Sequence, residues 1–517
     1  MKEVYYYVKM TLRKQSLKKR VTSMFITGEN KEMKNDVGLY AAFKAKDVRF
    51  DGRFFMGVSS TGIYCRPVCG ARMPKAENCT FYSSAAEAEH AGYRPCLVCR
   101  PELAPGVSIT DASSVLAQRA ARMLEEHCGN GEKMEVLAGQ LGCTGRHLRR
   151  VFMAEYHVTP IQYLQTCRLL LAKKLLTDTN LPVIDVAMAS GFGGLRRFND
   201  SFKEHYHLTP TDLRKKMSKE KRQSDNITVY LGYRPPYRWN EILRFLENRS
   251  IPGVDFVRDN MYFRTVHIVS SKKEDIYGWV RISHILEKNV LGVTIGETLL
   301  PVLPQVLGKI RNMFDLYCEP ETIYQALSTM NDIRPGLCLP GTRLPGCFDP
   351  FEMSVRAILG QQITVKAAST LAGRIVMAFG TPVQTGIDGL FRAFPTPENI
   401  AALEGPIENH LGPLGVIASR AKTIAALAKA FIQEEINFGF CPEPEEEMKK
   451  LLLIPGIGNW TAQYIAMRTM AWPDAFLETD VGIKNALPGY TPKELLNIAE
   501  QWRPWRSYAT LNLWNSL

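Results

Sequence analysis

The stretch LLLIPGIGNWTAQYIAMRTMAWPDAFLETD (451–480) joins two helical segments through the tight turn PGIG. The glycines of this turn, Gly456 and Gly458, expose backbone N–H groups at the start of the second helix. Such groups can hold a DNA phosphate without preference for a base. PGIG alone is weak evidence, but here a helix and then Asp480 follow it. The combination predicts a DNA-binding helical hairpin with a carboxylate behind it.

The flanking segments differ in periodicity. Residues 301–517 are mainly helical in pattern, whereas residues 227–300 alternate apolar and polar side chains. The alternation predicts an antiparallel sheet, with one helix over 238–249 between two of its strands. Residues 215–226 form a charged segment poor in apolar residues, which is typical of a linker.

Residues 227–517 resemble the helix-hairpin-helix glycosylases of the AlkA type, which act on 3-methyladenine, and RAILGQQITVKAA (356–368) and RPWRSYATLNLWN (503–515) belong to the resemblance. It implies that Asp480 lies beside the sugar of a flipped nucleotide and stabilises the positive charge that develops there. Judged alone, Asp480 would be a helix N-cap. The resemblance also implies a pocket for the flipped base and a DNA-inserting turn, made by Trp460, Tyr464, Trp514, Gln361 and Gln362. Each of these aromatic residues could equally belong to the core.

Three absences narrow the expected activity. Trp460 stands where lyases of this superfamily need a lysine, so lyase activity is not expected. The last cysteine is Cys441, so no iron–sulfur cluster is predicted. The chain has no PCHR motif, so an O6-alkylguanine methyltransferase domain is not expected.

Two similar units precede the linker, MEVLAGQLGCTGRHLRRVFMAEYHVTP (134–160) and LPVIDVAMASGFGGLRRFNDSFKEHYHLTP (181–210). Each fits a helix-turn-helix whose second helix enters the major groove. A lone basic helix is usually a solvated face, but two copies in the same order favour DNA binding. Residues 108–214 resemble the AraC-type regulator domain. The expected DNA contacts are Thr144, Arg146, His147 and Arg149 in the first unit, and Arg196, Arg197 and Asn199 in the second.

Four of the twelve cysteines are paired closely, in GIYCRPVCG (62–70) and RPCLVCRPE (94–102). The spacings C-x3-C and C-x2-C match a closed tetrahedral zinc site. We expect one Zn²⁺ bound by Cys65, Cys69, Cys96 and Cys99. By spacing alone this zinc would be purely structural. The nearby Arg66, Arg72, Arg94 and Arg100 would instead draw a phosphate backbone toward electron-rich sulfurs.

Residues 40–104 resemble the metal-binding domain of the Ada family of alkylation-response proteins. The resemblance implies that Cys65 is both a ligand and the acceptor of a methyl group from a methylphosphotriester in DNA. It also implies that Thr61, Arg72 and Arg94 contact the DNA backbone. Arg66 is a further candidate for such a contact, because of its charge beside Cys65.

Together these patterns predict a multidomain protein, mainly α with α+β parts. We expect a basic extension without a clear fold over 1–39, a zinc domain over 40–104, two tandem helix-turn-helix units over 108–214, an antiparallel-sheet domain over 227–300 and an all-α helix-hairpin-helix domain over 301–517. Met24 or Met33 could be a later start site. No membrane span or signal peptide is expected, so a cytoplasmic location follows. We also expect a monomer.

The net charge of +12 favours a polyanionic partner. The favoured function is therefore a methyl-accepting transcription activator fused to a monofunctional glycosylase for alkylated purines. Its partners would be alkylated DNA, promoter DNA and RNA polymerase. Two alternatives stay open. One is a regulator with a structural zinc and an inactive glycosylase-like half, and the other is a repair enzyme without regulation.

Overall fold

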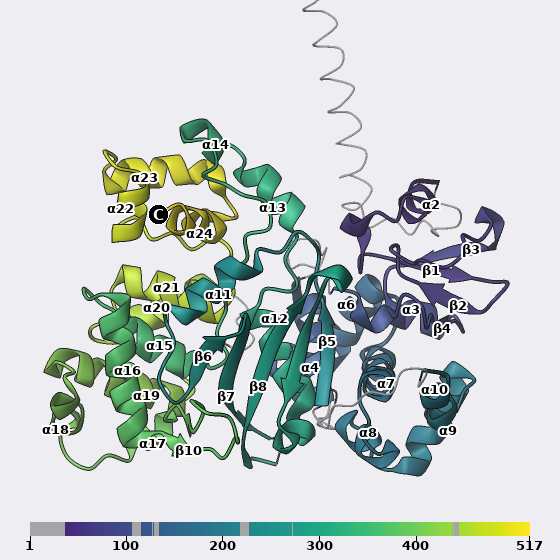
Figure 1. The fold of residues 1–517 in the computed structure, drawn as a ribbon, viewed down its shortest axis with the longest axis horizontal. Coiled ribbons are helices and arrows are strands. Elements are labelled where there is room, and N and C mark those ends of the chain that lie inside the picture. The colour runs from purple at the N-terminus through teal and green to yellow at the C-terminus, as the bar shows by residue number, and fades with distance from the viewer. Residues whose placement is uncertain are drawn as a thin grey trace, which may run out of the picture.

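The computed structural model describes residues 37–105, 115–126, 128, 134–217, 227–270, 272–436, 438 and 444–517. Most of the predicted basic extension, residues 1–36, lies outside these ranges, as does Cys441. Figure 1 shows a central sheet with the C-terminal helices on one side and the two N-terminal regions on the other. The predicted multidomain class, mainly α with α+β parts, is confirmed. Exact domain limits remain a prediction.

The cysteine domain (37–105) is small and rich in turns. Its sheet has the strand order β3-β1-β2-β4, with β2 and β4 parallel. The apolar cluster is modest, and the sulfurs of the four paired cysteines lie within or against it. The elements are α2 (Val37–Lys44), η1 (Val48–Phe50), β1 (Phe55–Val58), β2 (Ile63–Cys65), η2 (Ala76–Asn78), β3 (Cys79–Tyr82), α3 (Ala85–His90), β4 (Arg94–Pro95) and η3 (Pro101–Leu103).

The repeat domain (115–217) contains both predicted helix-turn-helix units, separated by the 19-residue helix α7 (Pro160–Asp178). The second helix of each unit ends in the same way, at a histidine with a left-handed backbone. These residues are His157 (φ 56°) and His207 (φ 53°). The remaining helices are α4 (Val115–Glu126), α5 (Met134–Gln140), α6 (Gly145–Tyr156), α8 (Val183–Ala189), α9 (Leu195–Tyr206) and α10 (Pro210–Met217).

The predicted antiparallel sheet has five strands in the order β5-β9-β8-β7-β6. Strand alternation places residues such as Val229 and Leu231 of β5 in the core. The predicted helix between two strands is α11 (Trp239–Glu247). The strands are β5 (Ile227–Gly232), β6 (Asp255–Arg258), β7 (Met261–Val269), β8 (Asp275–Ile285) and β9 (Val290–Ile295), with η5 (Leu286–Lys288) before the last strand.

The helical domain follows the turn η6 (Glu297–Val302). Its helices surround an apolar core that continues into the sheet and into the second helix-turn-helix unit. They are α12 (Leu303–Met313), α13 (Pro320–Leu327), α14 (Met330–Ile333), α15 (Pro350–Leu359), α16 (Val365–Phe379), α17 (Pro397–Ala401), α18 (Ile407–Leu411), α19 (Ala418–Ile432), α20 (Pro444–Leu452), α21 (Asn459–Thr469), α22 (Val481–Ala486), α23 (Pro492–Ala499) and α24 (Arg506–Asn515), with η7 (Gly412–Leu414), η8 (Glu500–Trp502) and the strand pair β10 (Thr381–Pro382) and β11 (Arg392–Ala393).

The N-terminal half is docked closely on the sheet. A Cβ at Gly232 of β5 would lie 1.8 Å from the carbonyl oxygen of Leu103, so only glycine fits this approach. Glu319 forms ion pairs with Arg53 at 2.7 Å and with Arg234 at 3.1 Å. Because Arg53 belongs to the cysteine domain, the Arg53–Glu319 pair ties that domain to the helical domain. Among the described residues, no helix is both long and apolar enough to cross a membrane.

Candidate functional site

Asp480 lies at the centre of the C-terminal site. Its carboxylate accepts hydrogen bonds from the indole N–H of Trp460 at 3.2 Å and of Trp514 at 2.9 Å. It also accepts the backbone N–H of Ile483 at 3.2 Å and so caps α22. Asp480 is therefore an N-cap, as its position alone suggests, and also the acceptor that joins Trp460 and Trp514, two of the aromatics predicted to form the pocket. A carboxylate fixed by three donors is oriented before any substrate arrives.

The three predicted pocket aromatics lie together. The rings of Trp460 and Tyr464 stack with centroids 5.2 Å apart, and Trp514 meets Tyr464 edge-on at 6.3 Å. Trp460 and Tyr464 share one face of α21 because they are four residues apart. Trp514 comes from α24, at the far end of the domain sequence. The arrangement gives a π-rich wall of the kind that suits an electron-poor ring.

Behind this wall lies a layer that the sequence analysis missed. Arg468 donates to the Tyr464 hydroxyl at 2.9 Å, and its guanidinium lies 4.7 Å from the Phe245 ring. Phe245 in turn stacks on Trp514. Burial raises the pKa of Tyr464, but the positive charges of Arg468 and Arg249 outweigh burial and lower it. The signal in the sequence was Arg468, which lies four residues after Tyr464 and so on the same face of α21.

The predicted hairpin consists of α20, the exposed turn and α21. Gly458 is the N-cap of α21 and provides no side-chain cap, so the first N–H groups of the helix are left for an external acceptor. Gly456 has φ +90°, and the Thr423 hydroxyl donates to the neighbouring Pro455 carbonyl at 2.8 Å. The geometry fits the predicted phosphate site.

Gly456→Ala should deform this turn. A Cβ at this position would lie 2.0 Å from the Thr423 hydroxyl oxygen, in a backbone conformation that alanine disfavours. We expect a loss of about 2 kcal/mol or more in the free energy of unfolding, measured by denaturant titration, and weaker DNA binding. Gly412→Ala is the matched control, because Gly412 has φ −57° and open space around its Cβ position. An equal loss in both variants would contradict the expectation.

The two predicted turn glutamines have different surroundings. Gln361 donates to the Gly456 carbonyl at 2.9 Å and to the Thr461 hydroxyl at 3.0 Å. Its amide nitrogen therefore ties the turn to the hairpin. Gln362 is exposed and has φ +55°, so it protrudes from the turn. Its exposure is compatible with the predicted role at a DNA-inserting turn, which stays a prediction.

The four paired cysteines converge on one point. Their Sγ atoms all lie within 4.8 Å of one another. Zn–S bonds of about 2.3 Å place tetrahedral thiolates about 3.8 Å apart. Backbone N–H groups point at three of the sulfurs, from Arg66 to Cys99 (3.3 Å), from Ala71 to Cys69 (3.5 Å) and from Val98 to Cys96 (3.3 Å). Such donors suit thiolates, so the residues fit a single Zn²⁺.

Arg66, which the charge pattern predicts to contact DNA, has partners within the cysteine domain. Its guanidinium is mostly buried, donates to the Asp51 carboxylate and donates to the Cys99 carbonyl at 3.0 Å. It therefore holds the two cysteine loops together. Thr61 and Arg72 are exposed, and Arg94 lies partly exposed on β4 beside β2, the strand that ends at Cys65. These three stay candidates for phosphate contacts.

Glu89 connects the strand of Cys65 to the repeat domain. Its buried carboxylate accepts hydrogen bonds from Tyr64 at 2.9 Å, Thr166 of α7 at 3.1 Å and Tyr206 of α9 at 3.3 Å. Burial raises the pKa of Glu89 to about 8, against the opposing effect of these hydrogen bonds. The residue before Cys65 and the end of the second recognition helix thus share one carboxylate.

The predicted recognition residues lie on the exposed faces of α6 and α9. Thr144 caps α6 by accepting the His147 N–H at 3.2 Å, and Arg149 pairs with Glu135 at 3.2 Å. The remaining candidates are exposed as well, namely Arg146, His147, Arg196, Arg197 and Asn199. Both helices can therefore present these side chains to a groove.

The fold and these sites define a modular DNA-repair protein with a zinc-binding domain, a helix-turn-helix domain and a helix-hairpin-helix domain. Four family models match, described as the metal binding domain of Ada (38–102), a helix-turn-helix domain (137–216), the AlkA N-terminal domain (228–349) and the HhH-GPD superfamily of base excision DNA repair proteins (355–492). The chain belongs to the family of bifunctional transcriptional activator/DNA repair enzymes AlkA.

Membership in that family follows from similarity over nearly the whole chain. The probable bifunctional transcriptional activator/DNA repair enzyme AlkA of Mycobacterium tuberculosis is 34% identical, over 92% of this chain and 96% of its own. DNA-3-methyladenine glycosylase 2 of Escherichia coli is 36% identical over 55% of this chain and 95% of its own. The bifunctional enzyme Ada of Escherichia coli is 39% identical over 24% of this chain and 34% of its own.

Proposed function

We propose that this protein senses DNA alkylation, activates transcription and excises alkylated purines. The observation that carries the proposal is the Asp480 carboxylate, held by the indoles of Trp460 and Trp514 next to the ring stack. The excised base would be a methylated purine such as 3-methyladenine. The N-terminal half would accept a methyl group from a methylphosphotriester and then bind promoter DNA.

In the excision step, the aromatic wall receives the flipped base and Asp480 faces its sugar. An alkylated purine is cationic and leaves readily, so little acid catalysis is needed. As the N-glycosidic bond breaks, its electrons leave with the base and the sugar becomes oxocarbenium-like. The Asp480 carboxylate stabilises that positive charge and helps orient the water that attacks the anomeric carbon. The product is a free base and an abasic site.

Hydrogen bonding to the four sulfurs supports Cys65 as the methyl acceptor. Among the described residues, no backbone N–H donates to the Cys65 sulfur, whereas each of the other three sulfurs accepts one. A donor draws electron density from a thiolate and weakens it as a nucleophile. Zinc, when bound, keeps the cysteines as thiolates at neutral pH. The Cys65 sulfur attacks the methyl carbon, and the C–O bond breaks as the phosphodiester leaves as an anion.

The DNA-binding assignments follow from exposure and charge. The exposed residues of α6 and α9 would read promoter bases, while Thr61, Arg72 and Arg94 would hold the backbone near Cys65. Gly456 and Gly458 would bind damaged DNA at the hairpin. Gln362 would enter the DNA from the turn that follows α15. RNA polymerase as a partner and a monomeric state belong to the same proposal.

Wild-type protein tests the enzymatic part. We expect it to release 3-methyladenine and 7-methylguanine from methylated duplex DNA without strand cleavage, as measured by chromatography of the released bases and by gel analysis of the duplex. A protein that binds the duplex but releases no base would favour a regulator with an inactive glycosylase-like half. Strand cleavage coupled to release would contradict the monofunctional assignment.

A further inference from the structure

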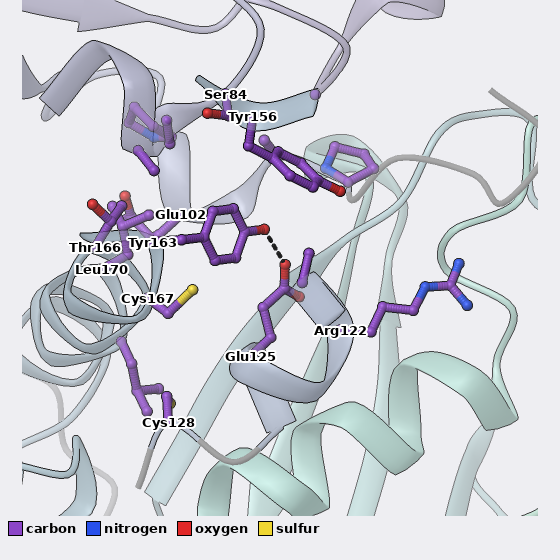
Figure 2. A pocket seen from close by; sticks show the side chains of 18 of the residues that line it. Ser84, Glu102, Arg122, Glu125, Cys128, Tyr156, Tyr163, Thr166, Cys167 and Leu170 are labelled. Atoms are coloured by element: carbon purple, nitrogen blue, oxygen red, sulfur yellow. Dashed lines mark hydrogen bonds between the residues drawn. The ribbon is translucent and has the colours of Figure 1, made fainter. Parts of the chain in front are cut away.

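A partly open cavity of about 190 Å³ lies where the cysteine domain, the repeat domain and α12 meet. Figure 2 shows Glu125 and Arg122 on one side of it and Tyr163, Cys167 and Leu170 on the other. The space is far larger than one water needs, about 10–15 Å³, and smaller than a site for a drug-sized ligand. Its lining includes none of the four paired cysteines and none of the residues around Asp480, and neither proposed activity uses it.

Two cations line this cavity without a described partner. Lys174 of α7 is only 3% exposed, yet its ammonium makes no hydrogen bond or ion pair with any described residue. The neighbouring Lys173 is equally buried but is paired with Glu102 at 2.5 Å. Arg311 reaches the cavity from α12, and its guanidinium likewise donates no hydrogen bond within the described part of the chain.

The acidic side chains at the cavity are already engaged. Glu102 accepts from Lys173 and from Arg100, the latter at 2.9 Å. Glu125 accepts the hydroxyl of Tyr163 at 2.8 Å and of Tyr317 at 3.4 Å. Arg122 is stacked over the Tyr317 ring at 4.4 Å. Asp178 and Glu102 act on Lys174 only from a distance, and Asp178 accepts from Arg100 at 2.6 Å. Lys174 is therefore the buried cation at this cavity whose ammonium has no hydrogen-bonded counterion among the described residues.

A buried ammonium without a counterion costs several kcal/mol unless it loses its proton or gains an anion. Burial and the charge of Arg311 lower the pKa of Lys174 to about 7, against the opposing charges of Asp178 and Glu102. The other nearby charge, Arg100, also lowers it. An anion seated beside Lys174 and Arg311 would offset both the burial and the repulsion between the two cations.

We propose that this cavity binds a small organic anion, whose carboxylate or phosphate group lies between Lys174 and Arg311. Its apolar part would pack on the wall formed by Leu170, Leu171 and Leu307. Arginine and lysine together favour an oxyanion through charge-assisted hydrogen bonds. Because the walls come from three parts of the chain, the ligand stabilises the docked arrangement of those parts.

Calorimetric titration of the full-length zinc-loaded protein tests the site, with benzoate and inorganic phosphate as probes and sodium chloride at equal ionic strength as reference. We expect saturable binding of one equivalent of at least one probe, and the probe that binds tells carboxylate from phosphate. Lys174→Met should weaken this binding by about tenfold or more. Lys288→Met, at an exposed lysine of η5, should leave it unchanged.

A second variant separates the site from effects on folding. Leu170→Trp fills the cavity but keeps both cations, and should also abolish binding in a protein that still melts cooperatively. Without ligand, Lys174→Met should melt no lower than wild type, because an unpaired buried charge has been replaced by an apolar side chain. Absence of saturable binding by both probes in wild type, or binding retained in either folded cavity variant, would overturn the proposal.

Discussion

Asp480→Asn should reduce the excision of 3-methyladenine by about a hundredfold to a thousandfold while DNA binding stays within a fewfold of wild type. The substitution keeps the size of the side chain and leaves an oxygen that can still accept the Ile483 N–H. It removes the negative charge that would face the sugar, and it directs an NH₂ group toward one of the two indole donors. Single-turnover base release and a binding titration on the same duplex measure the two effects separately.

Glu478→Gln is the matched control for this experiment. Glu478 is a carboxylate two residues earlier, and its partner is Asn459 at 3.4 Å rather than a pocket tryptophan. We expect its variant to excise bases at nearly the wild-type rate. Equal losses in the two variants would point to a general effect of charge near the hairpin, and an active Asp480→Asn protein would remove Asp480 from the mechanism.

Local sequence patterns were sufficient to predict those parts of the molecule that consist of short continuous segments. The hairpin around Gly456, the two helix-turn-helix units and the paired cysteines each occupy short segments with their own spacing rules. The alternation over 227–300 predicted the antiparallel sheet, because strand residues face opposite sides in turn. For these features the structure added distances rather than new elements.

Contacts between distant segments could not be predicted. From the sequence, Arg66 is expected to be a cation beside Cys65 that is available to DNA. In the structure its guanidinium contacts Asp51 and the Cys99 carbonyl. The support behind Tyr464 combines Phe245 with Arg468, more than 200 residues apart in the sequence. Such partners depend on how whole domains pack, which no local spacing encodes. The same limit applies to the cavity beside Lys174.

Cys65 should carry a single methyl group after the zinc-loaded protein is incubated with DNA that contains methylphosphotriesters. Mass spectrometry of the peptide that contains Cys65 measures the adduct, and one equivalent per chain is expected because a thioether does not turn over. Cys65→Ser should show no adduct at any position. Cys79→Ser should react like wild type, since the buried Cys79 thiol donates to the Lys75 carbonyl at 3.2 Å and is not one of the four converging cysteines.

The same methylation should raise promoter affinity by about tenfold. With Zn²⁺ held by the four cysteines, conversion of the Cys65 thiolate to a thioether would remove one negative charge, and a DNA backbone held by Thr61, Arg72 and Arg94 would lie within the range of that charge. The gain should shrink at high salt, because screening weakens the repulsion that methylation removes. Glu89 holds the strand of Cys65 against Tyr206 of α9, so the charge change occurs in a domain already docked on the second recognition helix. An adduct on Cys69, Cys96 or Cys99 instead of Cys65 would contradict the role given to the missing N–H donor at Cys65. An adduct on Cys65 without any gain in promoter affinity would indicate a repair activity that is not coupled to transcription.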